Sequence, residues 1–305
     1  MAQGRDNCTV ALCGLEETQV GYVPNLGGNA FYLAFFAVLI PPHVYLLIRY
    51  RTWGFGAAMV LGLMSEVAAY AGRVMLYSKP FGRDPFLSYI VPSTFAPAFF
   101  TAAIYLCLAR LVVSYGEHFS RLAPRLYTII FITCDFIALL LQAIGGAMAS
   151  TADTEADGDL GVNLMISGLA FQVFSLVLFI TLCSEFAWRV YKNKNNLNSK
   201  HEHLRSTNKF RAFHITLAIA TLTIFIRCVF RVAELSEGFD GALATDQVTF
   251  MILEGAMVAI ACIALTALHP GVAFQGSWKD SNFKLGGKKK LSDKDGEVSP
   301  PVESV

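Results

Sequence analysis

Charged residues are scarce in this sequence of 305 residues. Asp, Glu, Lys and Arg make up 15% of it, whereas hydrophobic residues make up 54% and the mean hydropathy is +0.50. A soluble globular domain carries about 25% charged residues, so a soluble fold is excluded. The formal net charge of +1 gives no basis for binding nucleic acid.

Several patterns are also missing, and each absence removes a class of protein. The sequence has no Walker A glycine loop, so the chain is not itself an ATP-driven pump. Segments of about ten residues in which apolar and polar residues alternate are absent, which excludes an outer-membrane barrel. No internal repeat supports an inverted-repeat transporter. Met1 to Glu17 lacks the apolar core of a signal peptide, so the first apolar segment is expected to act as the signal.

Long apolar segments are what the sequence does contain. Each is long enough to cross a hydrocarbon core about 30 Å thick at 1.5 Å per residue. The pattern predicts an all-α membrane protein, a bundle of seven transmembrane helices. The expected helices span residues 28–49, 55–78, 86–110, 126–150, 162–188, 212–235 and 247–268.

The distribution of Lys and Arg predicts the orientation. Eighteen of the 24 fall in connections on one side, three (Arg5, Lys79 and Arg83) on the other, and three within the membrane. Because basic residues favour the cytoplasmic side, the amino terminus is expected outside and the carboxyl terminus inside. The chain then divides into an exterior arm (1–27), a transmembrane domain (28–271) and a cytoplasmic, largely disordered tail (272–305). We expect the plasma membrane, with vacuolar or endosomal membranes left open.

The connections carry a few further signals. Asn7-Cys8-Thr9 is a glycosylation sequon on the expected outer side, where Cys8 and Cys13 could also pair. An acidic exterior loop is expected around residues 153–159. On the inner side, the basic stretch 191–211 is expected to contact anionic lipid headgroups.

Polar and ionisable residues inside the expected helices are the main candidate site. Charges within a membrane are costly unless they meet a partner or water. Arg227, Arg231 and Glu234 share one face of their helix at spacings of four and three. Three carboxylates (Glu66, Asp135, Glu254) oppose three arginines, with Glu234 at the rim. The candidate polar core comprises Glu66, Tyr70, Arg73, Asp135, Gln142, Gln172, Arg227, Arg231, Glu234 and Glu254.

Two interpretations of this core remain open. It is either a hydrated groove for an amphipathic ligand, opening toward the exterior leaflet, or a set of salt bridges that fixes helix order. Pro92 and Pro97 lie in the third expected helix. Buried contacts are expected to satisfy the backbone carbonyls that these prolines free.

Six sequence blocks occur in an order that resembles one known family. They are Glu66-x3-Tyr70-x-Gly72-Arg73, Ala96-Pro97 with Tyr105 and Arg110, Asp135-x6-Gln142-x2-Gly145-Gly146, Gly168-x3-Gln172, Ile226-Arg227-x2-Phe230-Arg231-x2-Glu234-x3-Gly238, and His269-Pro270-Gly271. Together, over roughly residues 20–275, they resemble the fungal RTA-like lipid-translocating exporter family. Ala69, Pro92 and Glu254 stand where the family pattern has Gly, Gln and Asp.

The resemblance implies a membrane protein that exports or translocates amphipathic lipids. The family is linked to sphingoid long-chain bases, to resistance against aminosterols and other toxic amphiphiles, and in one branch to porphyrins. Glu66, Asp135 or Glu254 would then pair with a substrate ammonium. We expect no cofactor, no metal and no catalytic residue; the oligomeric state is left open.

Two other classes compete with a transporter. Seven helices with an exterior amino terminus also fit a lipid receptor or sensor, although Arg110 has no acidic residue before it and the seventh helix lacks a retinal-binding lysine. A membrane zinc hydrolase would need His43, His214 and His269 to converge. No expected helix carries two histidines four residues apart, the spacing that places two ligands on one face.

Overall fold

The computed structural model is built from helices. It describes residues 14, 18, 20–152, 154–193, 202–237, 241–274 and 278. Within this part of the chain, seven helices are long and apolar enough to cross a membrane, which confirms the predicted seven-helix membrane fold. They are α2 (Leu26–Tyr50), α3 (Trp53–Ser78), α4 (Arg83–Tyr115), α5 (Pro124–Thr151), α6 (Glu155–Lys192), α8 (Asn208–Ser236) and a seventh built from α10 (Gln247–Phe250), η5 (Met251–Ala256) and α11 (Met257–Ala267).

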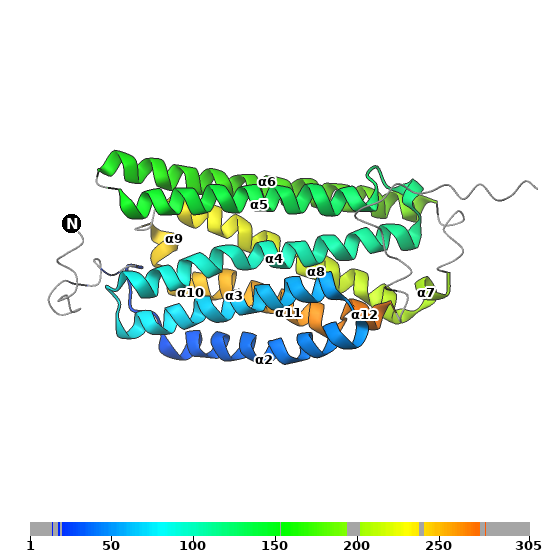
Figure 1. Cartoon of the computed structure of the whole chain (residues 1–305), viewed down its shortest axis with the longest axis horizontal. Helices are drawn as coiled ribbons and strands as arrows, with labels where there is room; N and C mark the ends of the chain where they lie inside the picture. Colours follow the sequence, from blue (N-terminus) through cyan, green and yellow to red (C-terminus); the bar gives the residue numbers. More distant parts are fainter. Residues whose placement is uncertain are drawn as a thin grey trace, which may run out of the picture.

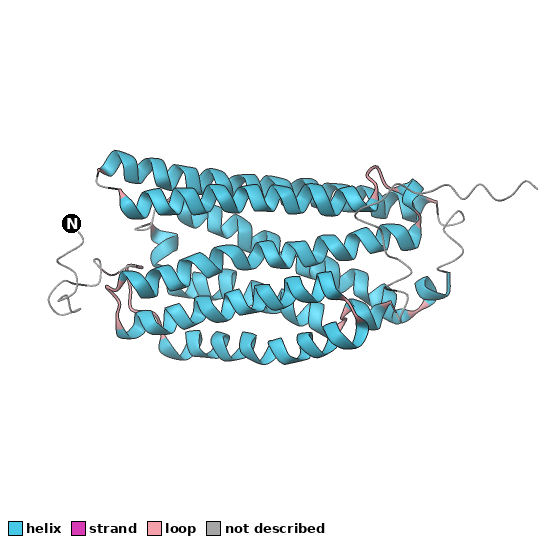
Figure 2. Ribbon diagram, viewed as in Figure 1, coloured by secondary structure: helices cyan, strands magenta, loops and turns pink. Residues whose placement is uncertain are grey.

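The helices form a single elongated bundle (Figure 1). Helix α3 packs between α2 and α4, α5 lies along α6, and α8 packs against both α11 and α6. Figure 1 shows α5 and α6 along one edge of the bundle and α2 along the opposite edge. The described ribbon in Figure 2 consists of helices joined by short loops.

Short helices mark the two ends of the bundle. One end, here the α9 end, carries α9 (Ala242–Thr245) and the start of α2. The other, the α7 end, carries α7 (Glu202–Ser206), η2 (Glu117–Phe119) and α12 (Pro270–Ala273).

The distribution of side chains is that of a protein dissolved in lipid. Phe31, Val38 and Phe174 are 63%, 70% and 64% exposed on the outside of the bundle, whereas Glu66 and Arg73 are 2% and 1% exposed. Lipid solvates apolar side chains, so polar groups gain by facing one another inside. The chain is therefore an integral, multi-pass membrane protein.

Glycines allow the closest helix contacts. A Cβ on Gly161 of α6 would lie 2.4 Å from the backbone nitrogen of Ala149 in α5, and one on Gly145 would lie 2.6 Å from the carbonyl oxygen of Gly161. A Cβ on Gly72 of α3 would lie 2.5 Å from the backbone nitrogen of Tyr89 in α4. Small residues let membrane helices approach in this way.

The seventh spanning helix is not a uniform α-helix. Its turn Met251–Ala256 is π-helical and contains Glu254. Such turns widen the helix locally and occur often at functional sites. Hydrophobicity predicts the span but cannot predict this change in winding.

The expected acidic loop is largely helical. Helix α6 begins at Glu155, and the hydroxyl of Thr154 caps it by accepting from the backbone N–H of Asp157 over 3.2 Å. Acidic residues in a first turn are stabilised by the positive end of the helix dipole, which hydropathy alone does not register. The expectation of a loop is wrong for the described residues; Asp153 lies outside them.

Candidate functional site

An ion pair between α8 and the π-helical turn lies at the centre of the site. Arg227 Nη2 lies 2.5 Å from Glu254 Oε1, and both side chains are 2% exposed. Ser93 of α4 donates its hydroxyl to the same carboxylate oxygen over 2.6 Å. The ion pair and the hydrogen bond together join α4, α8 and the seventh spanning helix. Loss of either charged partner would leave the other buried and unpaired, which is strongly destabilising.

Arg227 also binds the backbone of α4. Its Nη2 donates to the carbonyl oxygen of Ser93 over 2.5 Å. In a regular α-helix that carbonyl accepts from residue 97, but Pro97 has no N–H to offer. The expectation that buried contacts satisfy carbonyls freed by proline is confirmed at this position.

Glu66 of α3 is a buried carboxylate without an ion pair. It is 2% exposed, its Oε1 accepts no hydrogen bond, and no ion pair joins it to a described basic residue. The charges of Glu254, Arg227 and Arg231 act on it electrostatically. The hydroxyl of Tyr70, one turn along the helix, is also buried without a hydrogen-bond partner. A carboxylate oxygen and a hydroxyl thus lie side by side here without a hydrogen-bond partner from the described residues.

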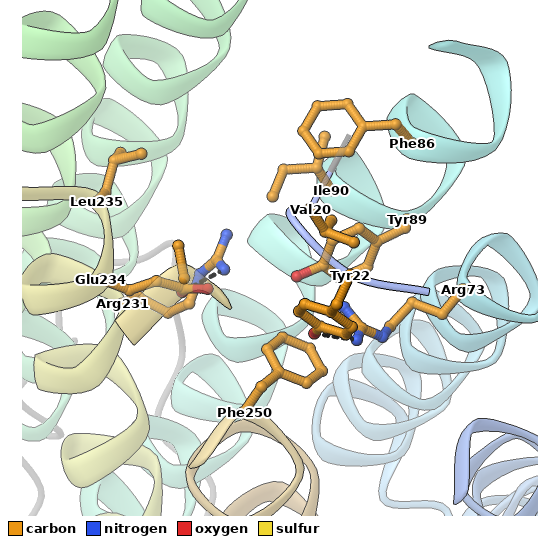
Figure 3. A pocket seen from close by; sticks show the side chains of 11 residues that line it. Val20, Tyr22, Arg73, Phe86, Tyr89, Ile90, Arg231, Glu234, Leu235 and Phe250 are labelled. Carbon is orange, nitrogen blue, oxygen red and sulfur yellow. Dashed lines mark hydrogen bonds and ion pairs between the residues drawn. The ribbon is translucent and has the colours of Figure 1, made fainter. Parts of the chain in front are cut away.

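A small pocket adjoins this centre at the α9 end (Figure 3). Arg231 and Glu234 of α8 lie on one side of it and form an ion pair, with Nη1 2.6 Å from Oε2. The other lining residues are Val20, Tyr22, Arg73, Phe86, Tyr89, Ile90, Leu235, Ala244 and Phe250. The cavity volume of about 30 Å³ has room for a water molecule or two. A lipid headgroup therefore enters only if the helices or the segment before α2 move.

Arg73 is held by neutral groups rather than by an acid. It donates from Nε to Asn29 Oδ1 over 2.9 Å and from Nη2 to the hydroxyl of Tyr22 over 2.7 Å. Its guanidinium carbon lies 3.8 Å from the centre of the Phe250 ring and 4.8 Å from that of Tyr89. No ion pair joins Arg73 to a carboxylate in the described residues, so cation–π contacts stabilise its charge.

The buried charges toward the α9 end of the bundle differ from the charge-balanced set that the sequence predicts. Glu234, expected at the rim, is 8% exposed and is paired within the core. Asp135 is 3% exposed but forms no ion pair with a described arginine. Placing Asp135 in the charge-balanced set is therefore wrong, because α5 holds it beside α4 rather than among the arginines. The balanced set is Glu66, Glu234 and Glu254 with Arg73, Arg227 and Arg231.

The remaining predicted residues form two separate polar contacts. Thr101 of α4 donates its hydroxyl to Asp135 Oδ2 over 2.6 Å. Gln142 Nε2 donates to Gln172 Oε1 over 3.2 Å, which joins α5 to α6. All ten predicted residues are buried, but they occupy three neighbouring places rather than one.

Sequence reasoning missed several participants. Ser93 precedes Pro97 by four residues, so its freed carbonyl was a signal that could have found it. Asn29 and Tyr22 carry no comparable pattern, since their roles depend on where the start of α2 meets α3. Asn7, Cys8 and Cys13 lie outside the described residues.

His43, His214 and His269 do not converge as a zinc hydrolase would require. The rings of His43 and His269 lie 6.1 Å apart, and His43 Nε2 lies 2.8 Å from Thr266 Oγ1. His214 instead lies 4.9 Å from the ring of Phe210. No group of three or more metal-binding side chains that could hold an ion is present in the described part of the chain.

Fold and site together define a multi-pass membrane protein whose ionisable groups meet inside the helix bundle. The chain belongs to the RTA1-like family. A family model described as "RTA1 like protein" matches residues 59–277, a range that contains all ten candidate core residues.

Curated relatives come from Saccharomyces cerevisiae. The chain is 36% identical to the protein named sphingoid long-chain base transporter RSB1 of strain Lalvin EC1118, over 84% of this chain and 74% of the relative. It is 27% identical to the protein named RTA1, over 77% of this chain and 79% of the relative. It is 25% identical to the protein named RTM1, over 67% of this chain and 64% of the relative. No solved structure matches.

Proposed function

We propose that this protein moves sphingoid long-chain bases, and amphiphiles of similar charge, between the leaflets of a membrane or out of the cell. The relative with 36% identity carries the name of a sphingoid long-chain base transporter. The observation that carries the proposal is Glu66, a buried carboxylate with no cationic partner among the described residues. A long-chain base is an ammonium with a long apolar tail, and an ammonium at membrane depth needs such a partner.

The contacts within the core separate Glu66 from the other glutamates. Glu254 is engaged by Arg227 and Ser93, and Glu234 is engaged by Arg231. Glu254 Oε2 also lacks a hydrogen-bond partner, but of the three glutamates Glu66 alone forms no ion pair with a described residue, and its Oε1 is free. The amino group of the substrate would bind this oxygen, and the hydroxyl of Tyr70 would bind a substrate hydroxyl. Arg227 already balances the charge of Glu254, so a second cation gains less there than at Glu66.

Entry from the α9 end fits this assignment. The small pocket beside Arg73 and Arg231 lies between that end and the central ion pair. Its aromatic side chains Tyr22, Tyr89 and Phe250 now hold the guanidinium of Arg73, so a substrate cation would have to displace Arg73 to bind the same ring faces. Widening this pocket is the conformational change that substrate entry requires.

We also propose an orientation and a location for the protein. We place the α9 end outside, with residues 1–27 as an exterior arm, because Lys and Arg concentrate at the α7 end. Residues 28–271 form the transmembrane domain and 272–305 the cytoplasmic tail. The basic stretch 191–211 would contact anionic headgroups of the inner leaflet. The plasma membrane is the proposed site, where export would also lower the load of toxic amphiphiles.

Leaflet-resolved transport in liposomes tests the function. Purified protein is expected to move a fluorescent sphingoid base without ATP, and Glu66→Gln is expected to abolish the movement. Glu185→Gln is the matched control: Glu185 pairs with Arg121 and Arg189 on a more exposed surface of α6. Unchanged movement in Glu66→Gln would overturn the site. No movement by the wild type, with or without a proton gradient, would favour a lipid sensor.

A further inference from the structure

Asp135 forms a second buried acidic site, away from the arginines. It lies near the middle of α5 and is 3% exposed. Thr101 contacts its Oδ2, while its Oδ1 has no hydrogen-bond partner. Two ionisable side chains that interact with it electrostatically are Tyr105 of α4 and Cys228 of α8. Helix α6 carries no ionisable side chain between Asp159 and Cys183.

An ionised Asp135 would therefore be a charge with no counter-charge. No arginine or lysine of the described residues forms an ion pair with it. Tyr105 and Cys228 are neutral in their ordinary states and cannot compensate a negative charge. A carboxylate transferred from water to an apolar interior normally avoids this cost by taking up a proton.

The hydrogen bonds at Thr101 provide a place for that proton. Thr101 Oγ1 lies 2.6 Å from Asp135 Oδ2 and 3.0 Å from the carbonyl oxygen of Ala98. A hydroxyl has one proton, so it cannot donate fully to both acceptors. If Asp135 carries a proton on Oδ2, it donates to Thr101, and Thr101 donates to Ala98. The acid O–H, the Thr101 hydroxyl and the Ala98 carbonyl oxygen then each have a partner, although Asp135 Oδ1 still has none.

We propose that Asp135 is a proton-binding site and that loading and release of its proton accompany substrate movement. On loading, a proton from water forms an O–H bond at Oδ2 and the carboxylate becomes a neutral acid. On release, that bond breaks and the proton returns to water. The link to substrate rests on the transport function proposed above, whereas the proton site does not.

The position of Asp135 gives the proton a way to act. The residue lies where α5 meets α4, and Cys228 brings α8 to the same place. The neutral acid fits the closed packing of these helices. An ionised carboxylate needs water, so release of the proton favours a state in which α5 separates from its neighbours.

Infrared spectroscopy of the full chain in lipid nanodiscs tests the proton site without any transport assay. Near neutral pH, the wild type is expected to show a protonated-carboxyl C=O band that loses intensity in Asp135→Asn. Asp157→Asn, a change at an exposed acid of α6, is expected to leave the band unchanged. A band of equal intensity in wild type and Asp135→Asn would overturn the proposal.

Thr101→Val keeps the acid and is independent of whether Asp135→Asn folds. The acid O–H loses its acceptor, so the C=O band is expected to move to higher wavenumber. A band that stays in place would contradict the proposed location of the proton. A purely structural role for Thr101 would not change this band.

Transport under an imposed pH gradient tests the link to substrate. Each pH unit is expected to change wild-type accumulation by up to about tenfold, whereas Asp135→Asn is expected not to respond. An equal response in both proteins would overturn the link. If the wild type moves no base at all, the transport proposal and the link both fail, and the infrared band still decides the proton site.

Discussion

Arg227 donates to the carbonyl oxygen of Ser93, at a turn of α4 where Pro97 removes the helical donor. One side chain thereby satisfies a backbone acceptor and neutralises Glu254 at the same depth. A proline in the middle of a membrane helix would otherwise leave a carbonyl unsatisfied, at a cost of the order of an unmade hydrogen bond. The missing backbone hydrogen bond in α4 and the buried charge of Arg227 on α8 therefore compensate each other.

Removing one member of the central ion pair is expected to be more harmful than removing both. Arg227→Met leaves Glu254 buried without its partner and is expected to lower the free energy of unfolding by about 3–5 kcal/mol. The double variant Arg227→Met/Glu254→Gln removes the stranded charge and is expected to recover part of that loss. Thermal unfolding of detergent-purified protein measures both.

Glu254→Gln alone completes the double-mutant cycle. The two single effects are expected to sum to more than the double effect, because both remove the same contact. Additive effects would show that Arg227 and Glu254 do not depend on each other.

Restoring the helical donor in α4 is expected to separate stability from transport. Pro97→Ala supplies an N–H that competes with Arg227 for the carbonyl of Ser93. The free energy of unfolding is expected to stay constant or rise, because α4 regains a regular hydrogen bond. Sphingoid-base movement is expected to fall, since Arg227 loses one of its anchors. Unchanged sphingoid-base movement with higher stability would show that the backbone hydrogen bond missing at Pro97 has no role in transport.

The sequence could predict most of the fold because lipid imposes a simple rule on it. Spanning helices must be apolar along about 20 residues, and seven such segments were evident. Helix ends and the π-helical turn at Glu254 could not be predicted. Helices continue past the hydrophobic core into polar sequence, and π-winding depends on packing rather than on composition.

The sequence could predict which residues lie in the buried polar core, but not which of them contact one another. Spacing along one helix places Arg227 and Glu234 on a common face, but says nothing about which helix lies opposite. Asp135 was expected among the arginines and lies beside Thr101 instead. Arg73 was expected to face an acid and is held by Asn29, Tyr22 and Phe250. Both differences are decided by helix order, which a single sequence does not encode locally.

A methyl group at Gly72 is expected to force α3 away from α4. The Cβ of Gly72→Ala would lie 2.5 Å from the backbone nitrogen of Tyr89. A backbone atom cannot relieve this clash by a change of rotamer, as a side chain could. The expected loss in unfolding free energy is about 1–3 kcal/mol. Gly146→Ala is the control, because its Cβ would meet Met165 Sδ at an ordinary 3.6 Å. Equal thermal midpoints for the two variants would contradict the close approach at Gly72.

Arg73 is expected to be replaceable by lysine only at a clear cost. Lysine keeps the charge but lacks the planar fork with which Arg73 reaches Asn29 and Tyr22 while stacking on Phe250. Losing hydrogen bonds to a buried charged group is expected to cost about 1.5–3 kcal/mol. Arg83→Lys serves as the control: Arg83 donates to the carbonyl of Ser150 in an exposed position, and its replacement is expected to change stability by less than about 0.5 kcal/mol. Thermal unfolding in nanodiscs measures the stability of both variants. If Arg73→Lys is as stable as Arg83→Lys, the guanidinium geometry is not needed. The positive charge alone would then hold the segment before α2 against the bundle.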